Sequence, residues 1–247
     1  MGFEDKIVAA SGIADSGGML FFLTGSPGTG KTTLIGTLDD IPEYHGRILI
    51  LAAGHGILAL ADRDTIAVST IEKWSDLNDA YLYLTRKEHP YRVVALDVAT
   101  EMYHMGLREV VAEGMATKNG QPTQEGYGVM NNRFIKMMRD FRILAEQKGV
   151  HVIFTSHTTE TKDEDRGMIL VRANLTPGTI ATVLGMVDVA AYLEIKNKKR
   201  ILHLVGSDRI IAKARKPMSW GAVPETLESP TFSTLLEALG QHQPENA

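Results

Sequence analysis

The sequence contains no cysteine, no apolar run long enough to cross a bilayer and no excess of positive charge. Without cysteine there is no disulfide, no thiolate metal site and no cysteine nucleophile, and the composition fits a reducing compartment. The longest apolar stretch, residues 48–61, is broken by Gly54, His55 and Gly56 and is shorter than a membrane span. The first residues carry acids and no apolar segment before a cleavage site, which argues against a secretory signal. We therefore expect a cytoplasmic protein that makes no contact with a membrane.

The charge and length of the chain limit its partners and its number of domains. With 26 Lys and Arg against 30 Asp and Glu, the formal net charge is -4, so any contact with nucleic acid needs a local patch of positive charge. The 247 residues can bury one large core without covalent cross-links. We expect a single domain over residues 1–236 and a disordered tail over residues 237–247.

Short apolar runs alternate with longer segments of helical period, which is typical of an α/β fold with a mostly parallel central sheet flanked by helices. Strands are expected at Met19–Thr24, Arg47–Leu51, Thr65–Ser69, Val93–Asp97, Val150–Thr155, Val187–Ile195 and Ile201–Val205. The last two flank the basic turn KNKKR, which predicts a C-terminal β-hairpin. Helices are expected at Lys31–Leu38, Glu72–Arg86 and Val129–Gln147.

Two segments, Tyr103–Tyr127 and Thr158–Ile180, lack clear periodicity. Each follows the end of an expected strand and is longer than most connections in compact domains. Loops of this length are usually functional or mobile, so both segments are expected to be loops and are candidates for binding a ligand.

Residues 25–32, GSPGTGKT, match the pattern G-x-x-x-x-G-K-[ST] at every fixed position. The apolar run MLFFLT precedes them and the helical segment TTLIGTL follows, so backbone N–H groups can converge on phosphate at the positive end of a helix. Lys31 supplies charge to the β- and γ-phosphates, and the Thr32 hydroxyl can bind Mg²⁺. Nucleoside triphosphate is expected to contact Gly25, Ser26, Pro27, Gly28, Thr29, Gly30, Lys31, Thr32 and Thr33.

Two further strands end in polar residues. RVVALD ends in Asp97, a candidate acid beside the magnesium ion, and VIFTSH ends in Ser156 and His157. The carboxyl ends of parallel strands share one edge of a sheet, so His157 can reach the γ-phosphate and report its presence to the segment that follows. The alternatives are an aspartate that merely ends a strand and a histidine with local hydrogen bonds.

The most basic part of the chain follows the expected hairpin. Residues 196–216 contain eight Lys or Arg and one acid. This segment is a solvated hairpin, a DNA contact or a set of cations for a neighbouring subunit's phosphates, and we favour phosphate contact for Lys213 and Arg215.

The order of these elements resembles that of the RecA-like core ATPases, and most closely the phage-encoded RecA-like single-strand annealing proteins of the Sak type. The phosphate loop comes first, then ALDVATE after a long helix, FTSH after a second helix and AKARKP near the end, so the resemblance spans Met19 to Trp220. It implies a RecA-like P-loop NTPase core that binds ATP and Mg²⁺ in the cytoplasm of a bacterial host. It also implies annealing or strand exchange on single-stranded DNA during phage recombination. The active form would be a ring or filament of identical subunits, which could bind replication or recombination proteins.

The resemblance also assigns roles to residues of this chain. His157 would sense the γ-phosphate, the segment Thr158–Ile180 would contact DNA, and Lys213 with Arg215 would reach a neighbour's nucleotide. The cations expected to touch DNA are Lys162, Arg166 and Arg172. Each of the two unassigned segments nevertheless has a net charge of -1, so one subunit is expected to bind DNA weakly and an assembly more strongly.

One departure from the resemblance concerns hydrolysis. The recombinases carry a glutamate that activates water after the second strand, whereas this chain reads LAAGHG, with Ala52 and Gly54 where acids would stand. The remaining candidates are His55 and Glu101, and we favour Glu101 because a carboxylate accepts a proton at neutral pH. A glutamate with a purely structural role is the alternative.

Two other classes of function therefore stay open. One is a P-loop phosphotransferase for a small molecule, with Asp163–Arg172 as its only candidate lid. The other is a nucleotide-dependent switch or loader for a replication protein, which the missing acid at LAAGHG would suit. The DNA-stimulated ATPase, with slow turnover, is the leading hypothesis.

Overall fold

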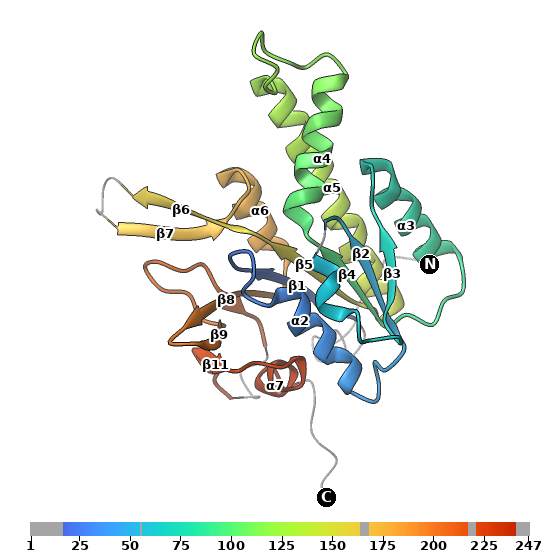
Figure 1. The fold of residues 1–247 in the computed structure, drawn as a ribbon, viewed down its shortest axis with the longest axis vertical. Helices are drawn as coiled ribbons and strands as arrows, with labels where there is room; N and C mark the ends of the chain where they lie inside the picture. Colours follow the sequence, from blue (N-terminus) through green and yellow to red (C-terminus); the bar gives the residue numbers. More distant parts are fainter. Residues whose placement is uncertain (1–16, 55, 164–167, 217–220, 241–247) are drawn as a thin grey trace, which may run out of the picture.

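The computed structural model describes residues 17–54, 56–163, 168–216 and 221–240 (Figure 1). Within them a nine-stranded sheet runs in the order β11-β9-β8-β1-β5-β4-β2-β3, with β10 beside β8. The five strands from β1 to β3 in this order are parallel to one another, and β8 is parallel to β1. The strands are β1 Leu20–Thr24, β2 Ile48–Ala52, β3 Ala67–Thr70, β4 Val93–Asp97, β5 His151–Ser156, β8 Val189–Lys196, β9 Lys199–His203, β10 Lys213–Ala214 and β11 Thr226–Glu228.

Helices cover both faces of this sheet. One apolar core packs helices α3, α4, α5 and α6 against one face of the sheet. The other packs α2 and α7 against the opposite face. The helices are α2 Lys31–Gly36, α3 Trp74–Arg86, α4 Ala99–Ala112, α5 Gln124–Lys148, α6 Pro177–Met186 and α7 Phe232–Ala238, with short 3₁₀ segments at Thr37–Asp40 and Gly56–Leu60. The predicted α/β fold class, with its mostly parallel sheet and its hairpin of β8 and β9, is confirmed. None of the described helices is both long and apolar enough to span a membrane.

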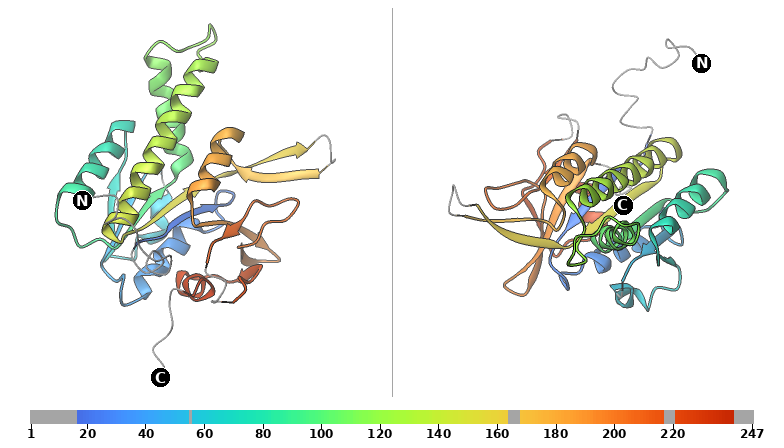
Figure 2. Two further views of the ribbon diagram at one scale, coloured as in Figure 1. Left: turned by 180° about the vertical axis from the view of Figure 1, so that it is seen from behind. Right: turned by 90° about the horizontal axis from the view of Figure 1, so that it is seen from above.

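The segment Tyr103–Tyr127 is a correction, because most of it is helix. It contains most of α4 and the first turn of α5, and these two helices rise together from the sheet as a projecting pair (Figures 1 and 2). Gly106 hid the helical period of α4, since glycine is a poor helix former. A Cβ at Gly106 would lie only 2.4 Å from the sulfur of Met130, so the glycine permits α4 to pack closely on α5.

The segment Thr158–Ile180 was also wrongly expected to be a loop. It forms an antiparallel pair of strands, β6 Thr158–Asp163 and β7 Met168–Ala173, followed by α6. This pair extends away from the main sheet (Figure 1). Its alternating Thr, Ile and Val residues suit a strand, but the interspersed acids and lysine concealed the pattern. Arg166 lies outside the described residues.

The first part of the expected tail, residues 237–240, is structured, and residues 241–247 lie outside the described residues. Helix α7 continues to Ala238, and Leu239 is fully buried against the α2 side of the sheet. Apolar residues at the helical spacing of FSTLLEALG bury this turn, and the described chain continues to Gly240.

The parallel strands give the sheet two functionally different edges. At the carboxyl edge β1, β4 and β5 end, and β5 lies between the other two. Thr24 pairs with Ser156 in register, so the loop after β1 begins beside the residue that precedes His157. At the amino edge β2, β4 and β5 begin.

Candidate nucleotide-binding site

The loop between β1 and α2 has the backbone of a phosphate cradle. Gly28 and Gly30 adopt φ angles of +79° and +99°, in the left-handed region that favours glycine. Gly30 is also the N-cap residue of α2, so the first N–H groups of that helix face the loop. The side chain of Thr29 donates to the carbonyl of Ser26 and closes the turn.

Lys31 is a buried cation aimed at this loop. Its side chain is 5% exposed, and Nζ donates to the carbonyls of Gly25 at 2.7 Å and Ser26 at 3.1 Å. Burial lowers the pKa of Lys31 to about 8, and the charge of Asp97 opposes that shift. Neutral carbonyls offset only part of the free energy that it costs to bury the Lys31 ammonium. A negatively charged phosphate group beside it would offset more.

Asp97 and Thr32 form the second part of the site. Thr32 Oγ1 donates to Asp97 Oδ2 at 2.7 Å, and Thr155 donates to the other carboxylate oxygen. Asp97 is only 4% exposed, yet both of its oxygens have partners. A hydroxyl beside a carboxylate at a phosphate loop is a donor set that suits Mg²⁺, with phosphate and water oxygens as its other ligands. No group of three or more His, Asp or Glu in the described part of the chain would hold a metal ion by itself.

His157 joins the cleft to the segment that follows β5. Its Nδ1 lies 3.5 Å from Lys31 Nζ, and burial together with the charge of Lys31 lowers its pKa. Its backbone N–H donates to Thr100 Oγ1 at 3.2 Å, and its carbonyl accepts from the N–H of Asn174 at 2.8 Å. A neutral imidazole in this position can hydrogen-bond a phosphate oxygen without adding charge to Lys31.

These groups line one cleft of about 540 Å³ at the carboxyl edge. Glu101, in the first turn of α4, lines the cleft with Asp97, as does Gly54, which carries no side chain. The structure therefore brings Glu101 to the place where an acid is needed, whereas its role in activating water stays a prediction. His55, the other candidate, lies outside the described residues.

Arg200 belongs to the same cleft, and sequence reasoning missed it. Its Nε donates to the carbonyl of Thr29 at 3.1 Å, and a Cβ at Gly30 would lie 2.6 Å from that nitrogen. The hairpin of β8 and β9 carries Arg200 to the loop because β8 pairs with β1. The basic turn KNKKR was a signal, but nothing in it distinguishes Arg200 from its neighbours.

Lys213 and Arg215 are not part of this cleft. The Lys213 ammonium donates to the carbonyl of Leu184, and Arg215 donates to that of Gly185 at 3.0 Å. Both cations thus lie at the C-terminal end of α6, where a helix presents free carbonyls and partial negative charge. Their expected contact with a neighbour's nucleotide stays a prediction.

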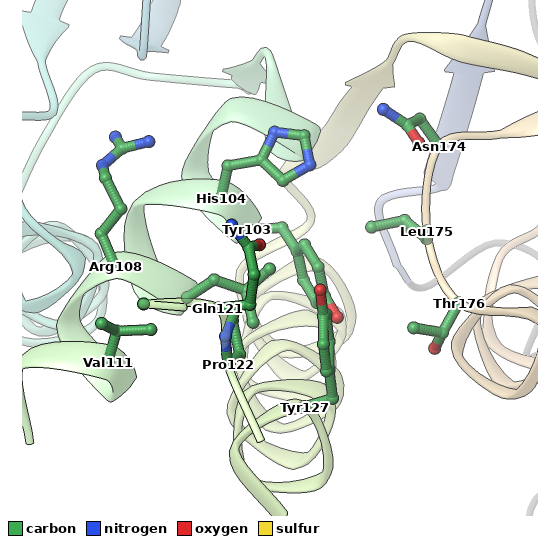
Figure 3. Close-up of a pocket in the computed structure, with 12 residues that line it drawn as sticks. Tyr103, His104, Arg108, Val111, Gln121, Pro122, Tyr127, Asn174, Leu175 and Thr176 are labelled. Atoms are coloured by element: carbon green, nitrogen blue, oxygen red, sulfur yellow. The ribbon is translucent and has the colours of Figure 1, made fainter. Parts of the chain in front are cut away.

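A second cavity, of about 620 Å³, lies between the projecting helices and the start of α6. Figure 3 shows His104 and Arg108 of α4 on one side, Asn174 to Thr176 on the other, and Tyr127 between them. The two segments that sequence analysis treated as candidate binding loops therefore meet at one cavity. Asn174, which lines it, is the residue that donates to His157.

The site has the arrangement of a P-loop NTPase. A phosphate loop follows β1, an acid ends β4, and β5 lies between these two strands. The family profile described as AAA domain matches residues 18–216. The chain belongs to this family, and AAA-type NTPases generally bind nucleotide with Mg²⁺. No curated protein gives a significant match to the chain.

Proposed function

We propose that this NTPase binds ATP and Mg²⁺, assembles on single-stranded DNA and promotes annealing or strand exchange in phage recombination, as the RecA-like Sak-type proteins do. Lys31 and the loop N–H groups would bind the phosphates, and Thr32 with Asp97 would bind the metal ion. Bound Mg²⁺ would neutralise phosphate charge. Arg200 would add a cation from the side of Thr29.

The observation that carries this proposal is a chain of contacts from one cavity to the other. Lys31 contacts the His157 ring, and the His157 carbonyl accepts from Asn174 at the second cavity. A γ-phosphate that displaced Lys31 from the loop carbonyls would move the charge beside His157. Such a movement would change the second cavity, as a nucleotide-dependent DNA site requires.

The second cavity and the β6–β7 pair are the surfaces proposed to touch DNA. Tyr127 is 38% exposed and can stack on a base, and Arg108 lies in the same cavity. Lys162 on β6 and Arg172 on β7 add cations. Repetition of these weak contacts in a homo-oligomer would raise the affinity for a long strand.

The test is the affinity for a fluorescent oligothymidylate with ADP and with a non-hydrolysable ATP analogue. We expect the analogue to tighten binding, and Thr100→Val to remove this increment, because Thr100 Oγ1 holds the His157 backbone. Thr182→Val is the matched control, since Thr182 is half-buried and its hydroxyl donates to the carbonyl of Gly178 in its own helix. Equal affinity of the wild type in both nucleotide states would contradict the proposal.

Glu101 is the proposed general base for hydrolysis. Glu101→Gln keeps the size of the side chain and removes its basicity, so we expect turnover to fall about 10²- to 10⁴-fold while nucleotide affinity is kept. Glu109→Gln, further along α4, is a control for the change of charge. An unchanged rate in Glu101→Gln would exclude the carboxylate as the base.

The proposed assembly also makes a prediction about Arg215. If Arg215 acts on a neighbour's nucleotide, Arg215→Ala binds ATP but turns it over slowly. Mixing it with Lys31→Ala subunits should restore part of the activity, because each variant supplies what the other lacks. Complete absence of rescue would argue against a shared site.

A nucleotide-dependent switch or loader is the second candidate. The observation in its favour is the lack of an acid from Ala52 to Gly54, a stretch of which Ala53 and Gly54 line the cleft with Asp97. Slow turnover suits a switch that holds ATP while it binds a replication or recombination protein. A protein complex that forms with ATP, dissolves with ADP and needs no DNA would favour it.

A further inference from the structure

A third cavity lies at the amino edge of the sheet, at the end opposite the nucleotide cleft. Its volume is about 560 Å³. It is placed where β2 and β4 begin and where α3 and α5 end. Its lining residues are Arg47, Lys87, Glu88, His89, Pro90, Tyr91, Arg92, Lys148 and Val150.

Four exposed cations surround this cavity in a chain whose net charge is negative. Two of them, Lys87 and Lys148, lie at helix C-termini and are favourable there. Arg47 and Arg92 have no such role, and they precede adjacent strands, with the N–H of Arg92 donating to the carbonyl of Arg47 at 2.8 Å.

None of these four cations forms an ion pair with another described residue. Glu88 is the only acid among the described lining residues. Like charges on neighbouring strands repel each other, so the arrangement costs stability unless an anion offsets it.

Two of the lining residues, His89 and Tyr91, carry aromatic rings, and Tyr83 of α3 lies next to His89 at the side of the cavity. The rings of His89 and Tyr91 are stacked, 5.6 Å apart at 24°, and the ring of Tyr83 lies 6.1 Å from that of His89 and is tilted by 32°. His89 Nε2 donates to the carbonyl of Leu84 at 3.0 Å, which fixes the central ring. Tyr83 is 43% exposed and leaves the outer end of the series open.

We propose that the cavity at the amino edge binds single-stranded nucleic acid, with its phosphates on the four cations and a base stacked on Tyr83. Cations combined with open aromatic faces are the features of single-strand binding. A duplex keeps its bases stacked internally, and the carboxylates of an acidic peptide cannot stack on a ring. This inference goes beyond the ATP-dependent contact proposed above, because the cavity is remote from Lys31 and His157 and needs no nucleotide.

The experiment measures oligothymidylate affinity against salt concentration without nucleotide. Lys87→Gln with Arg92→Gln should lower the magnitude of the slope of log Kobs against log salt by about 1.4, since each phosphate contact to a single strand contributes about 0.7. The matched control is Lys136→Gln with Arg139→Gln, an equal change of charge on the exposed side of α5. Unchanged affinity for a nucleotide analogue checks the fold of both variants.

Tyr83 tests the class of ligand. Tyr83→Ala should weaken oligothymidylate binding about tenfold, and Tyr83→Phe, which keeps a ring, should restore it. The assignment is overturned if both double variants change the slope equally, if Tyr83→Ala binds normally, or if polyglutamate or a duplex of equal charge competes as well as the single strand.

Lys31→Ala separates the two proposals. It should abolish the increment that ATP adds to DNA binding and leave the binding measured without nucleotide. If the increment is absent in the wild type while Arg92 still matters, the proposed function fails and this inference stands. The reverse result overturns this inference alone.

Discussion

Buried polar groups at the two edges of the sheet differ in whether a ligand can replace their hydrogen-bond partners. At the carboxyl edge, Lys31 bonds to loop carbonyls and Thr32 bonds to Asp97, and incoming phosphate and metal oxygens can replace these bonds. At the amino edge, His151 accepts from the N–H of Met19 at 2.9 Å through Nδ1 and lies 3.0 Å from the Tyr44 hydroxyl through Nε2. Both nitrogens of His151 are thus occupied by the fold itself. Exchangeable partners mark a site for ligands, whereas permanent partners close a core.

The largest expected effect is the loss of nucleotide binding in Lys31→Ala. Removing a buried cation from a phosphate site should weaken ATP affinity at least about a hundredfold. Lys136→Ala, an exposed lysine on α5, should have no effect. Titration calorimetry with an ATP analogue measures both, and wild-type affinity in Lys31→Ala would exclude the phosphate-loop assignment.

At the opposite edge, the buried His151 should make stability depend on pH. Burial lowers the pKa of His151 to about 4. Between pH 6.5 and pH 4 the unfolded chain therefore binds more protons at this group than the folded chain, so stability falls as pH falls. We expect a loss of about 3 kcal/mol in the free energy of unfolding between pH 7 and pH 4.

His151→Gln provides the comparison for that pH dependence, because glutamine keeps one acceptor and one donor but does not titrate. Denaturant unfolding at several pH values should show a shallower decline for the variant. Parallel curves for the two proteins would mean that His151 is not the titrating group.

Arg200→Ala is expected to have a smaller effect at the carboxyl edge. One charge-assisted contact beside the phosphates should account for about a tenfold loss of nucleotide affinity. Lys199→Ala changes the neighbouring cation, which pairs with Glu228 on the surface, and should leave affinity unchanged. Similar affinities of the two variants would show that Arg200 only supports the loop.

The smallest effect concerns the pKa of Lys31. Phosphate favours the charged ammonium, so binding raises a pKa that is about 8 in the free protein. Affinity should be constant at low pH and fall about fourfold between pH 7 and pH 8.5, with uptake of a proton on binding. Calorimetry in buffers of different ionisation enthalpy detects this proton, and release of a proton would contradict the assignment.

Much of the nucleotide cleft could be predicted because its parts are short and local. The phosphate loop is one run of residues, and Asp97 and His157 each end an apolar strand, so their common edge follows from parallel pairing. Helix α4 and strand β6 could not be predicted, because Gly106 and the acids of β6 give these segments low local propensity. Close packing of α4 on α5 and pairing of β6 with β7 override that propensity. Arg200 could not be selected from eight nearby cations, since its position depends on the pairing of β8 with β1.

The sequence by itself determined the α/β class, the phosphate loop and the acid at Asp97, because strand periodicity and glycine conformation are local properties of the chain. The tertiary structure decided which distant groups meet. It brought Arg200 and Glu101 to the cleft, directed Lys213 and Arg215 to the end of α6, and gathered four cations at the amino edge. Those contacts depend on strand order and helix packing, which no short segment encodes.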